Sequence, residues 1–217
     1  MIQPPINYTG SKFRLLKQIL PHLPAGVETF YDYFGGSSCV GLNMIDVSMQ
    51  VVYNDRDANL ARMLQFLRET PEEELIPRIR AVIQKHGLGK GEKDNFHTYR
   101  DYFNQDTFGN TPEEFIALIF HSFSSQIRYN RKGDKITSSS GGSEAYFREC
   151  HEKRLTTASA KFKEVPMQFL NKDLFEIDFD EPQEFDLVYL DPPYLASGET
   201  QYNHFWNEKH EMYLLEK

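Results

Sequence analysis

Residues 185–194 read Phe-Asp-Leu-Val-Tyr-Leu-Asp-Pro-Pro-Tyr. The first six are mostly apolar and predict a buried β-strand. Two consecutive prolines cannot continue the hydrogen-bonded ladder of a sheet, so the strand should end at Asp191 and the chain should turn. The turn would bring a carboxylate and an aromatic ring to the carboxyl end of a strand, where open α/β folds bind their ligands. Residues 191–194 are therefore a candidate functional site, although an ordinary loop can have the same composition.

An upstream segment predicts a βαβ unit. Residues 29–34 are rich in aromatic side chains and predict a strand, which the glycines at 35–36 end. Residues 40–47 predict a helix, and residues 50–53 predict a second strand that stops at the Asn-Asp pair 54–55. This is a βαβ unit with a glycine turn after its first strand.

Two features of this unit suit a ligand. The glycine turn allows close approach to the backbone, and the helix that follows presents free N–H groups. Asp55 follows the turn by about 20 residues, where an acid can bond ribose hydroxyls. The dinucleotide pattern G-x-G-x-x-G is absent, which argues against NAD. Near the N-terminus, Tyr8 and Lys12 offer a ring and a point charge for a carboxylate.

The middle of the chain predicts helices. The sequence Thr-Pro-Glu-Glu occurs at 70–73 and 111–114, and each copy predicts a helix start with Thr as the cap. Pro77 predicts a kink or restart of the first of these helices. Residues 115–123 are apolar nearly all round and predict a buried helix. The serine-glycine run 138–143 predicts a flexible loop.

Strand and helix alternation resumes near the end, with a third strand expected at 167–170 and a last helix at 208–217. We therefore expect an α/β fold. Its core would comprise residues 1–59 and 164–217, interrupted by a mostly helical insertion of residues 60–163.

Composition narrows the class of protein. The 217 residues allow one domain or one domain with a large insertion. The net charge of −8 argues against coating of nucleic acid by the whole surface but leaves room for a local basic patch. No signal peptide and no membrane-spanning apolar stretch is recognisable. Cys39 and Cys150 are too few for a disulfide framework, and no His/Cys cluster has metal-ligand spacing, so we expect a cytoplasmic protein without a metal.

Five segments in one order resemble the Dam-type DNA adenine methyltransferases, which transfer a methyl group from S-adenosylmethionine to adenine N6. The segments are residues 8–12, 30–36, 54–55, 171–174 and 191–194. The resemblance extends over essentially the whole chain. It implies a Rossmann-like S-adenosylmethionine-dependent methyltransferase core with a mostly helical DNA-recognition insertion.

The resemblance implies roles for particular residues. Asp55 would bind the cofactor ribose, and Asp173 would lie against the cofactor adenine. Ser37 stands where many relatives have glycine, which is tolerable if its φ is negative. The implied cofactor-binding residues are Tyr8, Lys12, Asp32, Phe34, Gly35, Gly36, Ser37, Ser38, Asp55, Asp173, Leu174 and Asp191.

The implied catalytic residues are Asp191, Pro192, Pro193 and Tyr194. The Asp191 carboxylate and the Pro192 carbonyl would accept N–H bonds from the exocyclic amine of adenine, and Tyr194 would stack on the base. Because N6 is inaccessible inside a stacked duplex, the adenine must be flipped out.

Double-stranded DNA is the implied partner. Residues 126–163 carry nine basic and four acidic side chains, an excess of five positive charges on an acidic chain. Residues 124–130 resemble the family's DNA-reading segment, but the run 138–143 lacks a further Arg expected there, so GATC is only one candidate target. The expected DNA-binding residues are Ser124, Gln126, Arg128, Asn130, Arg131 and Lys132.

The chain also departs from the family. Residues 202–206 still resemble it, but the C-terminal strands of its seven-stranded sheet are missing, which leaves the fourth strand at an uncovered apolar edge. A truncated chain, a natural fragment and completion by another chain all explain this. The resemblance implies the cytoplasm of a bacterium or of a phage-infected cell.

Two other functions stay open. Amino-methyltransferases acting on cytosine N4 or protein glutamine share the architecture, but they usually begin the tetrapeptide with Asn or Ser, so Asp191 favours adenine. The second alternative is a non-catalytic fragment or subunit that binds DNA or the cofactor.

Overall fold

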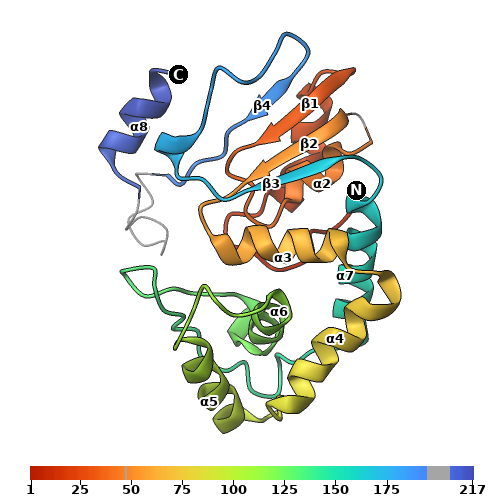
Figure 1. Cartoon of the computed structure of the whole chain (residues 1–217), viewed down its shortest axis with the longest axis vertical. Helices are drawn as coiled ribbons and strands as arrows, with labels where there is room; N and C mark the ends of the chain where they lie inside the picture. The colour runs from red at the N-terminus through yellow and green to blue at the C-terminus, as the bar shows by residue number, and fades with distance from the viewer. Residues whose placement is uncertain (47, 195–205) are drawn as a thin grey trace.

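The computed structural model describes residues 1–46, 48–194 and 206–217. Within these ranges the strands form one parallel sheet in the order β3-β2-β1-β4. The sheet lies at one end of the molecule, and helices α4, α5 and α6 lie at the other (Figure 1). The predicted α/β class is confirmed. The strands are β1 (Val27–Asp32), β2 (Ser48–Asn54), β3 (Met167–Leu170) and β4 (Leu187–Tyr189).

The strand order determines where a ligand can bind. The chain leaves β1 to form β2 on one side, whereas β4 pairs with the other side of β1. Asp32, at the end of β1, pairs in register with Tyr189, at the end of β4. Open α/β sheets bind ligands at such a switch point, beyond the carboxyl ends of the strands. The glycine turn after β1 and the proline turn after β4 therefore leave the sheet next to each other.

β4 is an edge strand, which corrects the expectation of a buried one. Within the part of the chain that the structure describes, it pairs with β1 only, and its residues are half-buried. Phe185 and Leu190, which flank β4, are 62% and 39% exposed. An apolar run usually indicates a strand covered on both faces and paired on both sides, but no described residue pairs with the outer edge of β4. Among the described residues the apolar edge is thus uncovered, as expected, and its completion by another chain stays a prediction.

Helices surround the sheet and build the other half of the molecule. Among the described residues, none of them is both long and apolar enough to cross a lipid bilayer. The helices are α1 (Leu16–Ile19), α2 (Cys39–Met44), α3 (Ala58–Glu69), α4 (Glu72–Lys85), α5 (Lys93–Phe103), α6 (Pro112–His121), α7 (Glu149–Phe162) and α8 (Glu208–Leu215).

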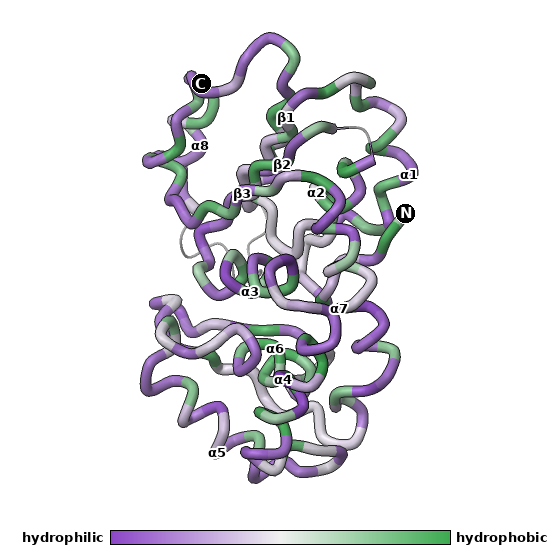
Figure 2. The backbone as a smooth tube through the Cα atoms, turned by 45° about the vertical axis from the view of Figure 1, so that its right-hand side comes forward, coloured by the Kyte–Doolittle hydropathy of each residue, from purple (hydrophilic) through white to green (hydrophobic). Residues whose placement is uncertain are grey.

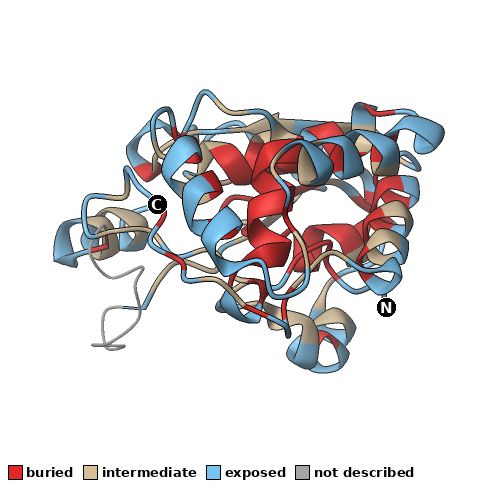
Figure 3. Ribbon diagram, turned by 90° about the horizontal axis from the view of Figure 1, so that it is seen from below, coloured by how far each residue is buried: buried red, intermediate tan, exposed pale blue. Residues whose placement is uncertain are grey.

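The two faces of the sheet pack into different hydrophobic clusters. Phe30 and Val51 join the larger cluster, which includes residues of α2, α3, α6 and α7. Their strand neighbours Tyr31 and Val52 point the other way and pack with Trp206 and the half-buried side of α8. Buried residues gather in the helices at the centre of the molecule (Figure 3), and α6 stands out as hydrophobic in Figure 2. Since the larger cluster contains residues of both predicted parts, the division at 60 and 163 stays a prediction.

The two predicted Thr-Pro helix starts behave differently. Thr111 caps α6 with a complete capping box, as predicted, and the buried character of that helix is also confirmed. At the other copy, α4 begins at Glu72, and Pro71 is its N-cap without a side-chain cap. The backbone N–H of Thr70 instead bonds to Phe66 and ends α3. At 70–73 the motif joins α3 directly to α4. Thr70 therefore ends α3 and does not cap α4. α4 also continues through Pro77 without a restart.

The serine-glycine run 138–143 is packed, which corrects the expectation of a flexible loop. Ser138 is 2% exposed, and its Oγ accepts a hydrogen bond from the Arg128 N–H at 2.8 Å. The same hydroxyl donates to the Gln126 carbonyl at 3.1 Å. Composition predicted mobility because such residues bury little apolar area, but hydrogen bonds of this kind also hold a chain in place.

Candidate functional site

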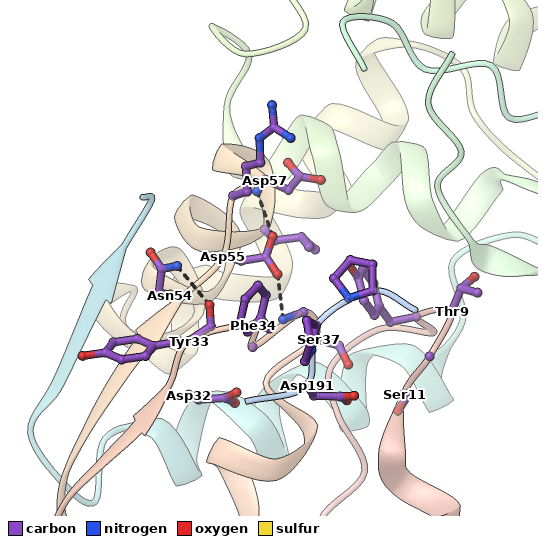
Figure 4. A pocket seen from close by; sticks show the side chains of 18 of the residues that line it. Thr9, Ser11, Asp32, Tyr33, Phe34, Ser37, Asn54, Asp55, Asp57 and Asp191 are labelled. Atoms are coloured by element: carbon purple, nitrogen blue, oxygen red, sulfur yellow. Dashed lines mark hydrogen bonds between the residues drawn. The ribbon is translucent and has the colours of Figure 1, made fainter. Parts of the chain in front are cut away.

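One cavity of about 650 Å³ brings the predicted segments together. It lies beyond the carboxyl ends of the strands, and Figure 4 shows Asp32, Asp55 and Asp191 around it. Ser38, Ser124, Arg128, Asn130 and Arg131 are not part of its lining. The predicted site residues that line it are Tyr8, Lys12, Asp32, Phe34, Gly35, Gly36, Ser37, Asp55, Gln126, Lys132, Asp173, Leu174, Asp191, Pro192, Pro193 and Tyr194.

The turn after β1 requires glycine at two positions. A Cβ on Gly35 would lie 2.3 Å from the ring of Tyr53, and a Cβ on Gly36 would lie 2.6 Å from the ring of Tyr8. Gly36 also has a φ of +51°, a backbone conformation that residues other than glycine rarely adopt. Tyr53 donates from its hydroxyl to the Gly36 carbonyl at 2.7 Å. The turn is therefore held tightly against two aromatic rings and cannot widen to accept a side chain.

Two serines at the start of α2 have hydroxyls without a hydrogen-bond partner among the described residues. Ser37 is 1% exposed and lines the cavity, and its Oγ has no partner in the described part of the chain. Ser37 does not have a positive φ, so a serine is tolerable at this position, where many relatives have glycine. Ser38, by contrast, has a φ of +55°. A buried hydroxyl without a partner costs about 1–3 kcal/mol. Ser37 therefore fits a polar ligand in the cavity.

One carboxyl group in the site, that of Asp32, is buried, and another, that of Asp55, is half-buried. Burial raises the pKa of Asp32 to about 7, and the charges of Asp191 and Asp55 add to this, although the Gly41 N–H opposes it. Burial likewise raises the pKa of Asp55 to about 6. Asp55 accepts from the backbone N–H of Gly36 at 2.9 Å and of Asp57 at 2.8 Å. These acids therefore favour a cationic ligand, whose charge would offset the cost of ionising them.

Replacing Asp32 by asparagine is expected to stabilise the fold at high pH. The folded pKa of about 7 lies above the ordinary 3.8, so the wild type loses stability as the pH rises through this window. At pH 8 the ionised carboxylate would cost on the order of 4 kcal/mol, which an uncharged amide avoids. Urea unfolding at pH 5 and pH 8 should show the advantage of the variant growing with pH. An equal difference at both pH values would contradict the raised pKa.

The proline turn carries a cluster of three polar side chains. Lys12 forms an ion pair with Asp191, and the Tyr194 hydroxyl donates to the other carboxylate oxygen at 3.1 Å. The Lys12 ammonium lies 5.6 Å from the centroid of the Tyr194 ring. Burial opposes the charge of Lys12, but the hydrogen bond and charge of Asp191 outweigh it and raise the pKa of Lys12. Lys12 therefore keeps Asp191 paired and oriented, and its expected contact with the cofactor stays a prediction.

The sequence reasoning missed an aromatic wall of the cavity. Trp206 and His210, which stack at 5.2 Å between ring centroids, line it beside Phe34. The Trp206 ring meets the Phe34 ring edge-on at 5.6 Å and donates from Nε1 to Glu211. Residues 202–205, which carried part of the resemblance, lie outside the described residues. The resemblance included Trp206 but gave it no role, and no local pattern indicated that its side chain would reach the cavity.

Asp173 lies on the same side of the cavity. Its carboxylate pairs with Arg56 at 3.2 Å and caps the short turn Leu174–Glu176 by accepting from the Phe175 N–H. The predicted contact of Asp173 with a cofactor adenine remains a prediction.

The predicted DNA-reading segment, residues 124–130, forms an irregular hairpin with the residues that follow it, up to Ser138. Tyr129 pairs with Ile136, and the Asn130 side chain closes the turn by donating to Asp134 at 2.7 Å and accepting from its N–H at 3.1 Å. Asn130 is therefore engaged within the turn. Gln126 reaches the cavity lining. The exposed cations of the hairpin are Arg128, Arg131, Lys132 and Lys135.

Some later cations of the basic segment are engaged within the protein, whereas Arg148 and Lys153 are exposed. Arg154 donates to Asn7 at 2.8 Å, and Lys161 pairs with Asp46 and is nearly buried. Asn7 in turn donates to the carbonyl of Ser124 at 3.1 Å. Ser124 has a φ of +58°. The hairpin therefore carries four exposed cations close together in sequence, and Arg154 helps to fix the turn before it.

Comparison with known proteins agrees with this geometry. Residues 8–217 match the family described as D12 class N6 adenine-specific DNA methyltransferase. The chain is 30% identical to the type II methyltransferase M.FokI of Planomicrobium okeanokoites and 30% identical to the modification methylase StsI of Streptococcus sanguinis. It is 32% identical to the modification methylase LlaI of Lactococcus lactis subsp. lactis. These alignments cover 99%, 99% and 89% of this chain but 33%, 33% and 30% of the relatives, so the chain spans about a third of their length.

Proposed function

The chain belongs to the D12 class of N6 adenine-specific DNA methyltransferases, and we propose from this that it transfers a methyl group from S-adenosylmethionine to N6 of an adenine in duplex DNA. The observation that carries the proposal is the shared cavity, which the turns at 35–36 and 191–194 both line. Because stacked adenine hides N6, the base would be flipped into this cavity. The cytoplasm is the proposed compartment because the DNA substrate lies there.

The residues around the glycine turn fit the cofactor. S-adenosylmethionine would supply a methyl group on a positively charged sulfonium. The acids Asp32 and Asp55, whose pKa values are raised by burial, favour such a cation, and Ser37 offers a hydroxyl that has no partner among the described residues. The proposed cofactor-binding set is Tyr8, Lys12, Asp32, Phe34, Gly35, Gly36, Ser37, Ser38, Asp55, Asp173, Leu174 and Asp191.

Asp191 would hold the amine that is methylated. Lys12 and Tyr194 already orient its two carboxylate oxygens, and each oxygen has capacity for a second hydrogen bond. The Asp191 carboxylate and the Pro192 carbonyl would accept hydrogen bonds from both N–H groups of the amine. These bonds would aim the nitrogen lone pair at the methyl group. Positive charge develops on N6 as the new N–C bond forms, and a neighbouring carboxylate stabilises that charge.

Lys12→Met is expected to slow methyl transfer by about 10–100-fold, because it removes the cation that orients Asp191. Calorimetry with S-adenosylmethionine separates two roles. Weaker binding supports the cofactor contact, and unchanged binding with slower transfer assigns Lys12 to Asp191 alone. Lys17→Met, at an exposed position of α1, is the matched control. Wild-type activity of Lys12→Met would contradict both roles.

Trp206 is expected to report cofactor binding by fluorescence. It is the only tryptophan of the chain and lines the cavity next to Phe34. A cofactor in contact with the indole should therefore change its emission in a saturable way, with the dissociation constant that calorimetry gives. Asp173→Ala should weaken this response, while Asp180→Ala, at an exposed position, should leave it unchanged. Saturation of the protein without any change in emission would contradict a contact at Trp206.

The hairpin supports the proposal of a DNA partner. Arg128, Arg131 and Lys132 are exposed cations suited to phosphates. Gln126 lines the cavity, where it could contact the flipped base or its neighbours. The proposed DNA-binding set is Ser124, Gln126, Arg128, Asn130, Arg131 and Lys132.

Transfer of a tritiated methyl group to unmethylated duplex DNA tests the proposal. The expected product is N6-methyladenine within one short sequence, and duplexes with and without GATC test that candidate target. N4-methylcytosine as the product would move the acceptor to cytosine. Cofactor binding without any transfer would overturn the enzymatic proposal and leave a non-catalytic binding unit.

A further inference from the structure

A line of hydrogen bonds connects the glycine turn with the DNA-reading hairpin. The Gly36 N–H donates to Asp55 at 2.9 Å, and the Asp57 N–H donates to the other oxygen of Asp55 at 2.8 Å (Figure 4). The Tyr129 hydroxyl then donates to the Asp57 carboxylate at 2.8 Å. Tyr129 lies 72 positions beyond Asp57 in the sequence. The hairpin is thus joined to the same short segment that binds the glycine turn.

Hydrogen bonds at the N-terminus of α3 hold the groups that bind the Tyr129 hydroxyl. Asp57 caps α3 by accepting from the Asn59 N–H at 2.9 Å. Asn59 is 1% exposed, and its side-chain amide donates to the Tyr129 hydroxyl at 3.3 Å and to the Thr107 carbonyl at 3.1 Å. Two groups from the N-terminus of α3 therefore fix the position of the phenol oxygen.

Tyr129 takes part in the backbone pairing of the hairpin. Tyr129 pairs with Ile136, which is 1% exposed, and it lies between Arg128 and Asn130. Its ring lines the cavity together with Ile127. A shift of Tyr129 away from Asp57 would therefore displace the residues that face DNA and change the wall of the cavity.

We propose that Tyr129 is a positioning residue that couples cofactor binding to DNA recognition through its hydrogen bond to Asp57. This inference rests on the proposed function. A ligand that bonds Asp55 or the Gly36 turn would fix the segment carrying Asp57, and Asp57 would hold the hairpin in place for DNA. Such coupling is reciprocal, so DNA on the hairpin must strengthen cofactor binding by the same factor, typically about 5–150-fold.

Tyr129→Phe tests the inference because it removes one hydroxyl and keeps the ring. Calorimetry measures binding of S-adenosylhomocysteine, which cannot react, to the protein alone and to the protein saturated with unmethylated duplex DNA. The ratio of the two dissociation constants should be at least about fivefold for the wild type and should approach one for Tyr129→Phe. Affinity in the absence of DNA should stay within about twofold, because the cofactor contacts are intact. Methyl transfer by the variant should also discriminate less between DNA sequences.

Tyr102→Phe is the matched control. Its hydroxyl also bonds a carboxylate, that of Glu114, but lies in α5 outside the cavity lining. It should keep the wild-type ratio, and thermal melting should show both variants folded. An unchanged ratio in Tyr129→Phe, or a ratio of one in the wild type, would overturn the inference while leaving the proposed function. Absence of any cofactor binding to the wild type would overturn both.

Discussion

Asp191→Ala is expected to reduce methyl transfer by at least about 10²–10³-fold while the protein still binds the cofactor. The carboxylate of Asp191 is the group oriented by Lys12 and by Tyr194, at the carboxyl end of β4. Without it, the amine of the base loses its acceptor and the developing charge loses its partner. Single-turnover transfer and calorimetry with S-adenosylmethionine measure the two effects separately.

Two further variants sharpen this test. Glu184→Ala removes an exposed carboxylate at the other end of β4 and should behave as the wild type. Asp191→Asn keeps one acceptor oxygen but loses the charge that pairs with Lys12, so it should fall between Asp191→Ala and the wild type. Wild-type turnover by Asp191→Ala would exclude Asp191 as a catalytic residue.

Gly35→Ala is expected to have the largest effect on cofactor binding and a clear effect on stability. The added Cβ would lie 2.3 Å from the Tyr53 ring, which is fully buried and cannot move aside. Overpacking of this kind costs typically about 1–3 kcal/mol. Any backbone shift would also displace Gly36, which bonds both Asp55 and the Tyr53 hydroxyl. Urea unfolding and cofactor calorimetry measure the two consequences.

Gly89→Ala is the control for that substitution. Its Cβ would lie 3.5 Å from Glu92, an ordinary contact, and its φ is not in the left-handed region. It should leave the free energy of unfolding and the cofactor affinity within error of the wild type. Equal values for Gly35→Ala would show that the turn can relax and would remove the argument for glycine.

Local patterns predicted the elements of the fold well. The strand expected at 167–170 has those bounds as β3, and the capping box at Thr111 begins α6. Such patterns succeed because hydrogen bonds and sterics between near neighbours determine them. The same reasoning failed for Thr70, whose N–H bonds to Phe66 in the preceding helix, and for the run 138–143, where Ser138 bonds to Arg128 and Gln126 across the turn.

The candidate site was only partly accessible from the sequence. The five segments could be ordered along the chain and most of them assigned to strand ends, so their meeting in one cavity was expected. The pairing of Lys12 with Asp191 and the wall formed by Trp206 were not predicted. The first depends on two side chains more than 100 residues apart, and the second depends on how the segment before α8 returns to the sheet. No local pattern contains that information.

The sequence by itself determined the residue chemistry: acids and glycines at strand ends, a proline turn with an aromatic ring, and helices in between. These follow from backbone restrictions and from hydrophobic periodicity, which act over a few residues. Only the tertiary structure decided that Lys12 pairs with Asp191, that burial raises the pKa of Asp32 and Asp55, and that Tyr129 bonds Asp57. Exposure, desolvation and hydrogen bonds between distant residues depend on which surfaces face each other once the chain has packed.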